Sequence, residues 1–580
     1  MPEKATFETE TLQVSLTSDM AVQGQSHDRA QDRASNSAAM TNFYTWGNSG
    51  FLLQYFVVGL VYGGLPATLY PVLQLYLNVP GYVYGAARAM ATLPWSFKAA
   101  YGALHDLVPI RGYRRKPWMA IGWTICGLAL LLLTFAGLPA PYWCTDDEGV
   151  YVTTCDGAHL AHPACAHANA TAAHGGVNVT AAAVVAAEPC NASAAEEGGH
   201  VAMLFCLACL GYVCADVAAD GLTVTYAQQE PLATRGRTQS TVYLIRSLGF
   251  IASALLVGFG MNGREYGGSF GGGLSFEGLC ATLAVPCFAM VPASIWLVRE
   301  SPVARPRAGA YFSGVWGLLK SNFFLSIILF DLVYSSLSNV NSPGAIEVTT
   351  HWAHVQNLQK QLFGVFAQVV YSGGLLFTKR YLLGFSWRWM IVLTSLSVMA
   401  IDVLFSALTV FDVVRNQYFY LGEAFLVDIP LAVQFLVTTF VVVEAAGNDN
   451  GGLVYGLLTT ASNIGLAFST PLSNQIFGGF TPSLSDADNF IADAPAFRQT
   501  VFNSLLIGYL CTVISFVVLP LLPDQKAQTH ERRRTWGQHK RTGQLSIALL
   551  LFGFVYSSGI TVLTMFPASA CLKLVGGEGC

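Results

Sequence analysis

The sequence predicts an all-α membrane protein in which two six-helix halves are followed by one extra C-terminal transmembrane helix. Three observations predict this fold class. Hydrophobic residues make up 53% of the 580 residues and charged residues only 11%, whereas soluble domains carry about 25% charged residues. Thirteen apolar stretches are each long enough for a helix to cross a bilayer, which takes roughly 20 residues. Basic residues gather in alternate loops between these stretches.

The thirteen stretches form two sets of six and one last stretch. The first set lies near 51–77, 82–104, 118–138, 201–224, 241–262 and 278–298. The second set lies near 321–340, 360–378, 389–410, 421–443, 452–471 and 500–522, and the last stretch is 545–566. We therefore expect an N-terminal half at 46–298, a cytoplasmic connector at 299–320 and a C-terminal half at 321–522. Residues 523–580 predict a basic cytoplasmic loop, the additional helix and a short external tail.

The first 45 residues are polar and contain no apolar run. We expect residues 1–45 to form a disordered cytoplasmic tail, without a cleavable signal peptide. The formal net charge of -4 suggests no nucleic-acid partner.

The distribution of Lys and Arg orients the predicted helices. Loops after even-numbered stretches carry most of the loop cations, whereas the opposite loops and the tail hold only Arg264, Lys360, Arg415, Arg498 and Lys573. Because cytoplasmic loops are enriched in basic residues, the N-terminus is predicted to be cytoplasmic. We expect a multi-pass protein of the plasma membrane.

The loop at 139–200 is expected to be external. It contains no Lys or Arg and carries three glycosylation sequons, at Asn169, Asn178 and Asn191. It also holds Cys144, Cys155, Cys165 and Cys190. An even set of cysteines in such a loop predicts two disulfides in an oxidising compartment, with the pairing left open. The alternative is that an Ala/Thr/Asn-rich loop produces sequons by chance.

The remaining cysteines point to no metal site. Cys571 and Cys580 are further disulfide candidates, because the last stretch would place them outside. The other seven lie in apolar stretches and are interpreted as small core residues. No Cys/His cluster has the spacing of a zinc site, so we predict neither a metal nor a cofactor.

A short internal loop carries the most specific motif. Gly102-Ala-Leu-His-Asp106 is followed by Gly112-Tyr-Arg-Arg-Lys116, between the second and third stretches. Glycine lets neighbouring helices approach closely. Asp106 is expected to cap a helix N-terminus or to pair with a basic residue on the moving half. An ordinary cytoplasmic loop needs only the basic residues, here Arg114 and Arg115, so the pattern favours a gating motif of the major facilitator type.

Two longer blocks carry a family resemblance. Residues 92–122 read TLPWSFKAAYGALHDLVPIRGYRRKPWMAIG, and residues 216–249 read DVAADGLTVTYAQQEPLATRGRTQSTVYLIRSLG. Both resemble the folate–biopterin transporter family of the major facilitator superfamily, in its protist form. The matching positions are Leu93, Pro94, Trp95, Lys98, Tyr101, Gly102, Asp106, Gly112, Tyr113, Arg114 and Arg115, then Asp216, Asp220, Arg235, Gly236 and Arg246. His105 departs from the small residue often found before the motif aspartate.

The resemblance implies a secondary active transporter that moves folates or pterins by alternating access. Because a carboxylate embedded in the membrane can carry a proton, protons are the expected coupling ion. The alternatives are a transporter of another metabolite, such as S-adenosylmethionine, and a transport-inactive receptor or scaffold. An enzyme is not expected, because the sequence shows no nucleotide-binding loop, no His-Glu-x-x-His and no Gly-x-Ser-x-Gly.

Charged residues inside the apolar stretches are the candidate site. Each costs roughly 2.5 to 3.5 kcal/mol on insertion scales. Some are expected to form structural ion pairs or to lie at interfaces, and a functional role is favoured for the set Lys98, Asp216, Asp220 and Arg246. We predict that Arg88, Lys98, Asp216, Asp220 and Arg246 bind the substrate or carry the coupling proton. A carboxylate suits the donor edge of a pterin, and a cation such as Lys98, Arg88 or Arg246 suits an anionic tail. Further acids, Asp331, Asp402, Glu423 and Asp428, lie in the second half.

The first apolar stretch is expected to be an interrupted helix. Gly59 and Gly63 are four residues apart, and Pro66 and Pro71 follow them. Interrupted helices often line transport sites, although a simple proline kink explains the same pattern.

Overall fold

The structure is a computed structural model that describes residues 46–580 apart from 156–158, 160, 167–184, 229–236, 304, 306, 383, 447–450, 578 and 580. Within these residues, ten helices are long and apolar enough to cross a membrane. The other three predicted stretches are also helical. The stretch at 82–104 is broken by a 3-10 turn, the stretch at 321–340 contains a 17-residue apolar helix, and the stretch at 452–471 lies in the helix at 451–477. The all-α prediction is therefore confirmed. Residues 1–45, Asn169, Asn178, Arg235, Gly236 and Cys580 lie outside the described part.

The first group of helices follows the first set of stretches. It consists of α2 (Trp46–Leu69) with its π-helical continuation η1 (Tyr70–Tyr76), α3 (Gly81–Thr92), the 3-10 segment η2 (Leu93–Phe97), α4 (Lys98–Leu107), α5 (Lys116–Ala136), α7 (Gly198–Gln228), α8 (Arg237–Gly260) and α9 (Phe276–Trp296). One apolar core joins these helices, and Trp123, Phe205 and Tyr212 are among its fully buried side chains.

The second group follows the second set. It consists of α11 (Asn322–Ser338), α12 (Gly344–Glu347) with the π-helical segment η7 (Val348–Trp352), α13 (Asn357–Tyr381), α14 (Trp387–Val410), α15 (Gln417–Ala446), α16 (Gly451–Phe477), α17 (Ala487–Ala492) and α18 (Pro495–Ser515) with the 3-10 segment η8 (Phe516–Leu521). Its own core includes Phe323, Ile391 and Leu458. Each group thus buries an apolar core of its own.

Helices α2 and α8 pack backbone against backbone. A Cβ added at Gly59 would lie 2.0 Å from the carbonyl oxygen of Arg246, and one at Gly249 would lie 2.1 Å from that of Phe56. Glycine is required at both positions, because small residues allow helices in a membrane to approach this closely. Beyond this contact, Pro66 and Pro71 lie where the α-helix changes into the π-helix η1.

The helix near the C-terminus packs against both groups. α20 (Lys540–Thr564) follows α19 (Lys526–Thr535) and precedes α21 (Pro567–Ala570) and the 3-10 turn η9 (Lys573–Val575). Tyr556 donates to Oε1 of Gln475 on α16 at 2.7 Å, and the Phe554 ring lies 4.8 Å from that of Phe97. These contacts place α20 beside α16 and the 3-10 segment η2.

The loop at 139–200 is folded around two disulfides. β1 (Cys144–Thr145) pairs with β2 (Tyr151–Val152), and β3 (Thr154–Cys155) pairs with β4 (Val185–Ala186), both antiparallel. Short 3-10 turns are η3 (Pro163–Cys165), η4 (Ala192–Glu197) and, in the next loop, η6 (Arg264–Tyr266). Cys144 is bonded to Cys190, and Cys155 to Cys165. The structure thus supplies a pairing that spacing left open.

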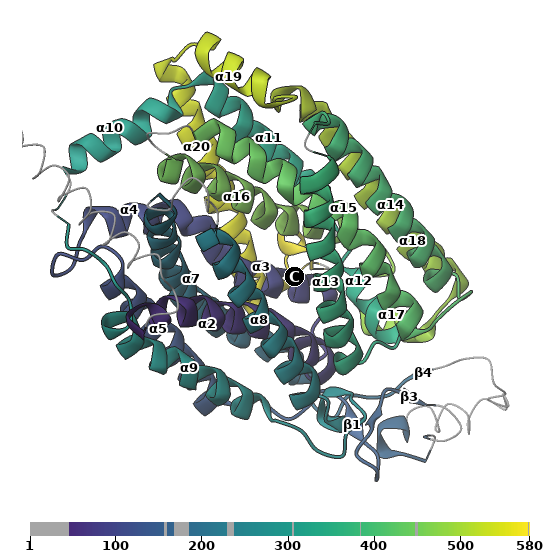
Figure 1. Ribbon diagram of the computed structural model, residues 1–580. Helices are drawn as coiled ribbons and strands as arrows, with labels where there is room; N and C mark the ends of the chain where they lie inside the picture. Colours follow the sequence, from purple (N-terminus) through teal and green to yellow (C-terminus); the bar gives the residue numbers. More distant parts are fainter. Residues whose placement is uncertain are drawn as a thin grey trace, which may run out of the picture.

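The two ends of the bundle differ in character. The strands and α17 lie at one end, whereas α19 and α10 (Ala308–Leu319), which belongs to the connector, lie at the other (Figure 1). At the strand end the groups touch: Gln74 of η1 donates to Glu347 at 2.9 Å, and Asn357 of α13 donates to the carbonyls of Val257 and Met261 at 3.0 Å. The side chains of Gln74 and Glu347 are both almost completely buried. We call this contact at the strand end the outer gate.

Candidate functional site

A lysine and two carboxylates form the centre of the candidate site. Nζ of Lys98 lies 3.1 Å from Oδ2 of Asp220 and 3.6 Å from Oδ2 of Asp216. Lys98 begins α4 directly after the 3-10 turn η2, whose Pro94 cannot donate the hydrogen bond that a continuous α-helix needs. The two aspartates lie one turn apart on α7, so both point at the same partner.

The two carboxylates differ sharply in exposure. The Asp216 side chain is 0% exposed, whereas that of Asp220 is 37% exposed. Asp220 also accepts a hydrogen bond from the Tyr55 hydroxyl at 3.1 Å, and Tyr55 shares a 2.6 Å contact with Thr223. Of the two carboxylates, Asp220 is therefore the accessible one in this conformation.

Aromatic rings cover the cationic side of this cluster. The guanidinium carbon of Arg246 lies 5.0 Å from the centre of the Tyr62 ring and 5.3 Å from that of Trp95. Trp95 also lies 4.4 Å from Nζ of Lys98 and donates from Nε1 to the Tyr212 hydroxyl at 3.0 Å. The rings hold both cations in place by cation–π attraction. They also form flat surfaces on which a planar ring can stack.

The structure brings together four of the five predicted site residues: Lys98, Asp216, Asp220 and Arg246. Arg88 is separate from them, and its charge faces Lys360 of α13. The expectation that Lys360 lies in an external loop is wrong, because α13 begins three residues earlier and carries Lys360 in its first turn.

Sequence analysis missed the tyrosines of the site. Tyr55 and Tyr62 lie in an apolar stretch and read as core residues. Their spacing of two helical turns on α2 was the available signal, since it places both hydroxyl-bearing rings on the face toward α7 and α8.

The gating motif is held together within one group of helices. Nη2 of Arg115 donates to Oδ1 of Asp106 at 2.6 Å. The Arg115 guanidinium passes over Gly221 of α7, where an added Cβ would lie 2.5 Å from its Cζ atom. The expectation that Asp106 caps a helix or pairs with the other half is wrong in this conformation, because Arg115 takes that place.

The two glycines of the motif differ in whether the structure requires glycine at that position. Gly112 has φ +83°, a backbone conformation that other residues rarely adopt. A Cβ added at Gly102 would meet nothing within 4 Å. The expected close helix approach at Gly102 is therefore wrong.

Glu300 closes the same loop and was not predicted. Its carboxylate accepts from the backbone N–H groups of Arg114 at 2.8 Å, Arg115 at 2.9 Å and Lys116 at 3.0 Å. A carboxylate at the first N–H groups of α5 satisfies donors that have no partner inside the helix. A single acid at the start of a basic connector was the signal that pointed to it.

Two acids of the second group, Asp402 of α14 and Glu423 of α15, lie close enough to share a side-chain hydrogen bond. Asp402 lines a cavity of about 210 Å³ together with Ser395, Gln434 and Tyr509, and it accepts from Ser406 at 2.9 Å. Asp331 and Asp428 do not line this cavity. In the part of the chain that the structure describes, no three His, Cys, Asp or Glu side chains gather to hold a metal ion.

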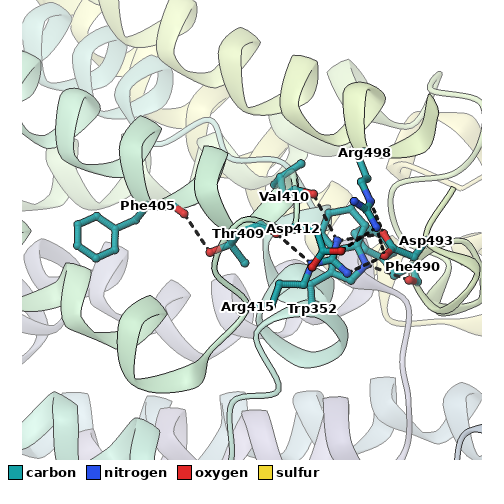
Figure 2. A network of polar contacts seen from close by, with 9 residues as sticks. All are labelled: Trp352, Phe405, Thr409, Val410, Asp412, Arg415, Phe490, Asp493 and Arg498. Carbon is teal, nitrogen blue, oxygen red and sulfur yellow. Dashed lines mark hydrogen bonds and ion pairs between the residues drawn. The ribbon is translucent and has the colours of Figure 1, made fainter. Parts of the chain in front are cut away.

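A network of two arginines and two aspartates lies at the strand end, and we call it the outer latch (Figure 2). Asp493 accepts from Nη1 of Arg415 at 2.6 Å and from Nε of Arg498 at 2.8 Å, and Asp412 lies 3.3 Å from both arginines. Burial alone would raise the pKa of Asp493, but the two arginines outweigh it and hold that pKa below its usual range.

The latch also positions Trp352. The Arg415 guanidinium carbon lies 4.7 Å from the centre of its ring, and Nε1 of Trp352 donates to the carbonyl of Phe490 at 2.9 Å. Because Trp352 ends η7, the latch fixes the segment that begins next to Glu347 of the outer gate.

A comparison with protein families bears on the first part of the site. Residues 59–141 match the BT1 family. The match supports the resemblance to folate–biopterin transporters seen in the sequence, and it includes Lys98, Trp95, Asp106 and Arg115. Asp216, Asp220 and Arg246 lie beyond the matched residues. No curated protein sequence matches the chain.

Solved structures show the same fold. A D-xylose–proton symporter has a TM-score of 0.53 at 11% identity, covering 82% of this chain and 97% of the other. The nucleoside transporter NupG has a TM-score of 0.52 at 13% identity, covering 82% and 99%. The inward open xylose transporter XylE from E. coli has a TM-score of 0.50 at 11% identity, covering 84% and 98%. The chain therefore has a major facilitator-like fold, and these likenesses concern the fold alone.

Proposed function

We propose that this protein is a secondary active transporter of folates, pterins or related small metabolites, driven by protons. The observation that carries the proposal is the contact of Lys98 with two carboxylates of unequal exposure inside a helical bundle. An ion cluster in such a place is costly and is kept where it serves transport. The match at residues 59–141 supports the cargo class.

The two aspartates take different roles in this proposal. Asp220 binds the cargo, because its carboxylate is reachable and can accept two hydrogen bonds from the donor edge of a pterin. Trp95 and Arg246 then stack on the ring. Asp216 carries the coupling proton, because it is closed off from the cargo and shares Lys98 with Asp220. Protonation of Asp216 leaves Lys98 paired with Asp220 alone.

The contacts between the two groups support alternating access. The outer gate and the Asn357 contacts close the strand end in this conformation. Outward opening requires these contacts to break while the loop around Asp106 rearranges at the opposite end. In the membrane, we place the N-terminus and α19 in the cytoplasm, the disulfide-bonded loop outside, and α20 across the bilayer of the plasma membrane.

Uptake into liposomes tests this function. Folate, biopterin and S-adenosylmethionine are offered with and without an inward proton gradient, and exchange is measured separately. Asp216→Asn should retain exchange but lose gradient-driven accumulation, whereas Asp220→Asn should lose both. Asp147→Asn, an exposed loop residue, is the matched control. Normal accumulation by both site variants would overturn the assignment and direct the search to Asp331, Asp402 and Asp428.

A further inference from the structure

Two cations, Lys360 and Arg88, have no acidic partner in the part of the chain that the structure describes. Nζ of Lys360 lies 3.5 Å from the centre of the Tyr70 ring, and the charge of Arg88 acts on Lys360 from the other group of helices. Neither side chain has a carboxylate at ion-pair distance among the described residues. By contrast, the Lys98 charge is already balanced by two aspartates.

The Tyr70 ring next to Lys360 is held in a fixed position. The Tyr70 hydroxyl donates to the carbonyl of Val355 at 2.6 Å, which fixes the ring beneath the ammonium group. Tyr70 is 1% exposed and begins the π-helix η1, and π-helical turns occur frequently at functional sites. Among the described residues, this ring is the stabilising contact of the Lys360 ammonium group, and a cation–π contact does not replace an ion pair.

Arg88 completes the pair from the other group of helices. It is exposed, although most of the other residues of α3 are buried. Its charge also faces Tyr84, which is 6% exposed. Because its charge acts on Lys360 of α13, the exposed guanidinium lies on the side of α3 that is turned toward the second group.

We propose that Lys360 and Arg88 form an anion site that binds a carboxylate of the cargo between the two groups of helices. The identity of the cargo rests on the proposed function, whereas the anion site rests on the two cations. A carboxylate there would supply the counter-charge that the protein lacks and would draw the two groups together.

The position of the pair constrains the shape of the ligand. Arg88 and Lys98 follow one another along α3, η2 and α4, about 15 Å apart along the helical path. A ligand that contacts Asp220 at one end and the cation pair at the other must be elongated. It carries hydrogen-bond donors on its ring end and a carboxylate on its tail.

Equilibrium binding to the purified full-length chain tests the site with four probes. Folate has both ends, biopterin has the ring end without a carboxylate, p-aminobenzoylglutamate has the tail alone, and inorganic phosphate is a competing anion. Lys360→Met and Arg88→Met should each weaken binding of folate and p-aminobenzoylglutamate by roughly 10- to 100-fold, as expected for a lost charge-assisted contact. Biopterin affinity should not change.

Two controls separate loss of the site from loss of the fold. Lys360→Arg keeps the charge and should retain most of the affinity. Lys540→Met removes an exposed lysine at the start of α20 and should bind all probes normally. Gel filtration and thermal unfolding of each variant establish that it is folded.

The outcomes also separate the two proposals. Binding of p-aminobenzoylglutamate that depends on Lys360, without binding of folate or biopterin, would support the anion site and reject the cargo assignment. Three outcomes would overturn the anion site. In the first, the wild type binds neither carboxylate probe; in the second, folded Lys360→Met and Arg88→Met bind both probes as tightly as the wild type. In the third, phosphate is the one probe whose binding depends on the two cations.

Discussion

Nε2 of Gln74 donates a 2.9 Å hydrogen bond to Oε2 of Glu347, and both side chains are at most 1% exposed. The two residues come from different groups of helices and lie on or next to π-helical segments, η1 and η7. His351 lies 3.4 Å from the same carboxylate. The contact therefore joins the interrupted first helix of one group to the corresponding region of the other.

Loss of this bond should open the strand end. Gln74→Leu leaves Glu347 without its amide donor, at a cost of roughly 1.5–3 kcal/mol for a hydrogen bond to a charged group. The population with separated outer ends should rise about 10- to 100-fold. Distances between spin labels at Phe270 and Val413, both exposed, measure this change. Gln499→Leu, on the exposed face of α18, is the control; unchanged distances in Gln74→Leu would refute the gate.

Asp106→Asn should slow transport while leaving equilibrium binding of cargo intact, because its contact with Arg115 lies at the end opposite the outer gate. Gly221→Ala should have the same effect, since its new Cβ would displace the Arg115 guanidinium. The double variant should be no slower than either single one, as expected for residues that act through one contact. Gly102→Ala meets nothing within 4 Å and should transport normally. Loss of binding in folded Asp106→Asn would show that its role is wrongly assigned.

The outer latch should be stable from neutral to mildly acidic pH. The pKa of Asp493 is depressed in the folded state. Its contribution to stability is therefore fully present above the pKa of an aspartate in the unfolded chain, about 3.9, and is lost only as the pH falls through the pKa of the folded state. Asp493→Asn should lower stability by about 1–2 kcal/mol at pH 7 and pH 5 alike. The difference in apparent Tm from the wild type should shrink only below about pH 4. Asp147→Asn should show no such difference, and a gap that closes already between pH 7 and pH 5 would contradict this account.

The disulfide-bonded loop should carry N-glycans, but Asn191 should be its poorest acceptor. Its Nδ2, the atom to which a glycan attaches, donates to the carbonyl of Ala140 at 2.8 Å beside the bonded Cys190. Glycosidase treatment should shift the electrophoretic mobility of the expressed protein. Asn191→Gln should change that shift less than Asn169→Gln or Asn178→Gln does. A shift that disappears entirely in Asn191→Gln would reverse the ranking, and no shift in the wild type would count against an external loop.

A tag placed after Cys580 should be reachable on intact cells. The α20 helix has 25 residues and is apolar enough to cross a bilayer. The basic segment before it favours the cytoplasmic side. An internal tag between Lys526 and Thr535 should be reached only after permeabilisation. Labelling of the C-terminal tag that also requires permeabilisation would place α20 on the cytoplasmic side instead.

The sequence by itself determined the class of fold, because helix length and hydrophobicity are set locally by the bilayer. Each apolar stretch must satisfy its backbone within its own helix, so the helix positions could be predicted without knowledge of their neighbours. The candidate set of Lys98, Asp216, Asp220 and Arg246 was also predictable, since charges stand out in an apolar stretch.

Only the tertiary structure decided which charges meet. The lysine at 98 contacts α7 more than a hundred residues away, and no local pattern encodes that distance. The same holds for Arg115, which takes Asp106 as its partner, and for Glu300, which approaches α5 from the end of α9. Lys360 shows the limit most clearly. Its sequence neighbours are typical of the edge of a loop, but packing of α13 against α8 brings it into the bundle, where it contacts the Tyr70 ring and meets the charge of Arg88. The burial of a charge depends on the helices that surround the side chain, and the sequence of its own segment does not reveal them.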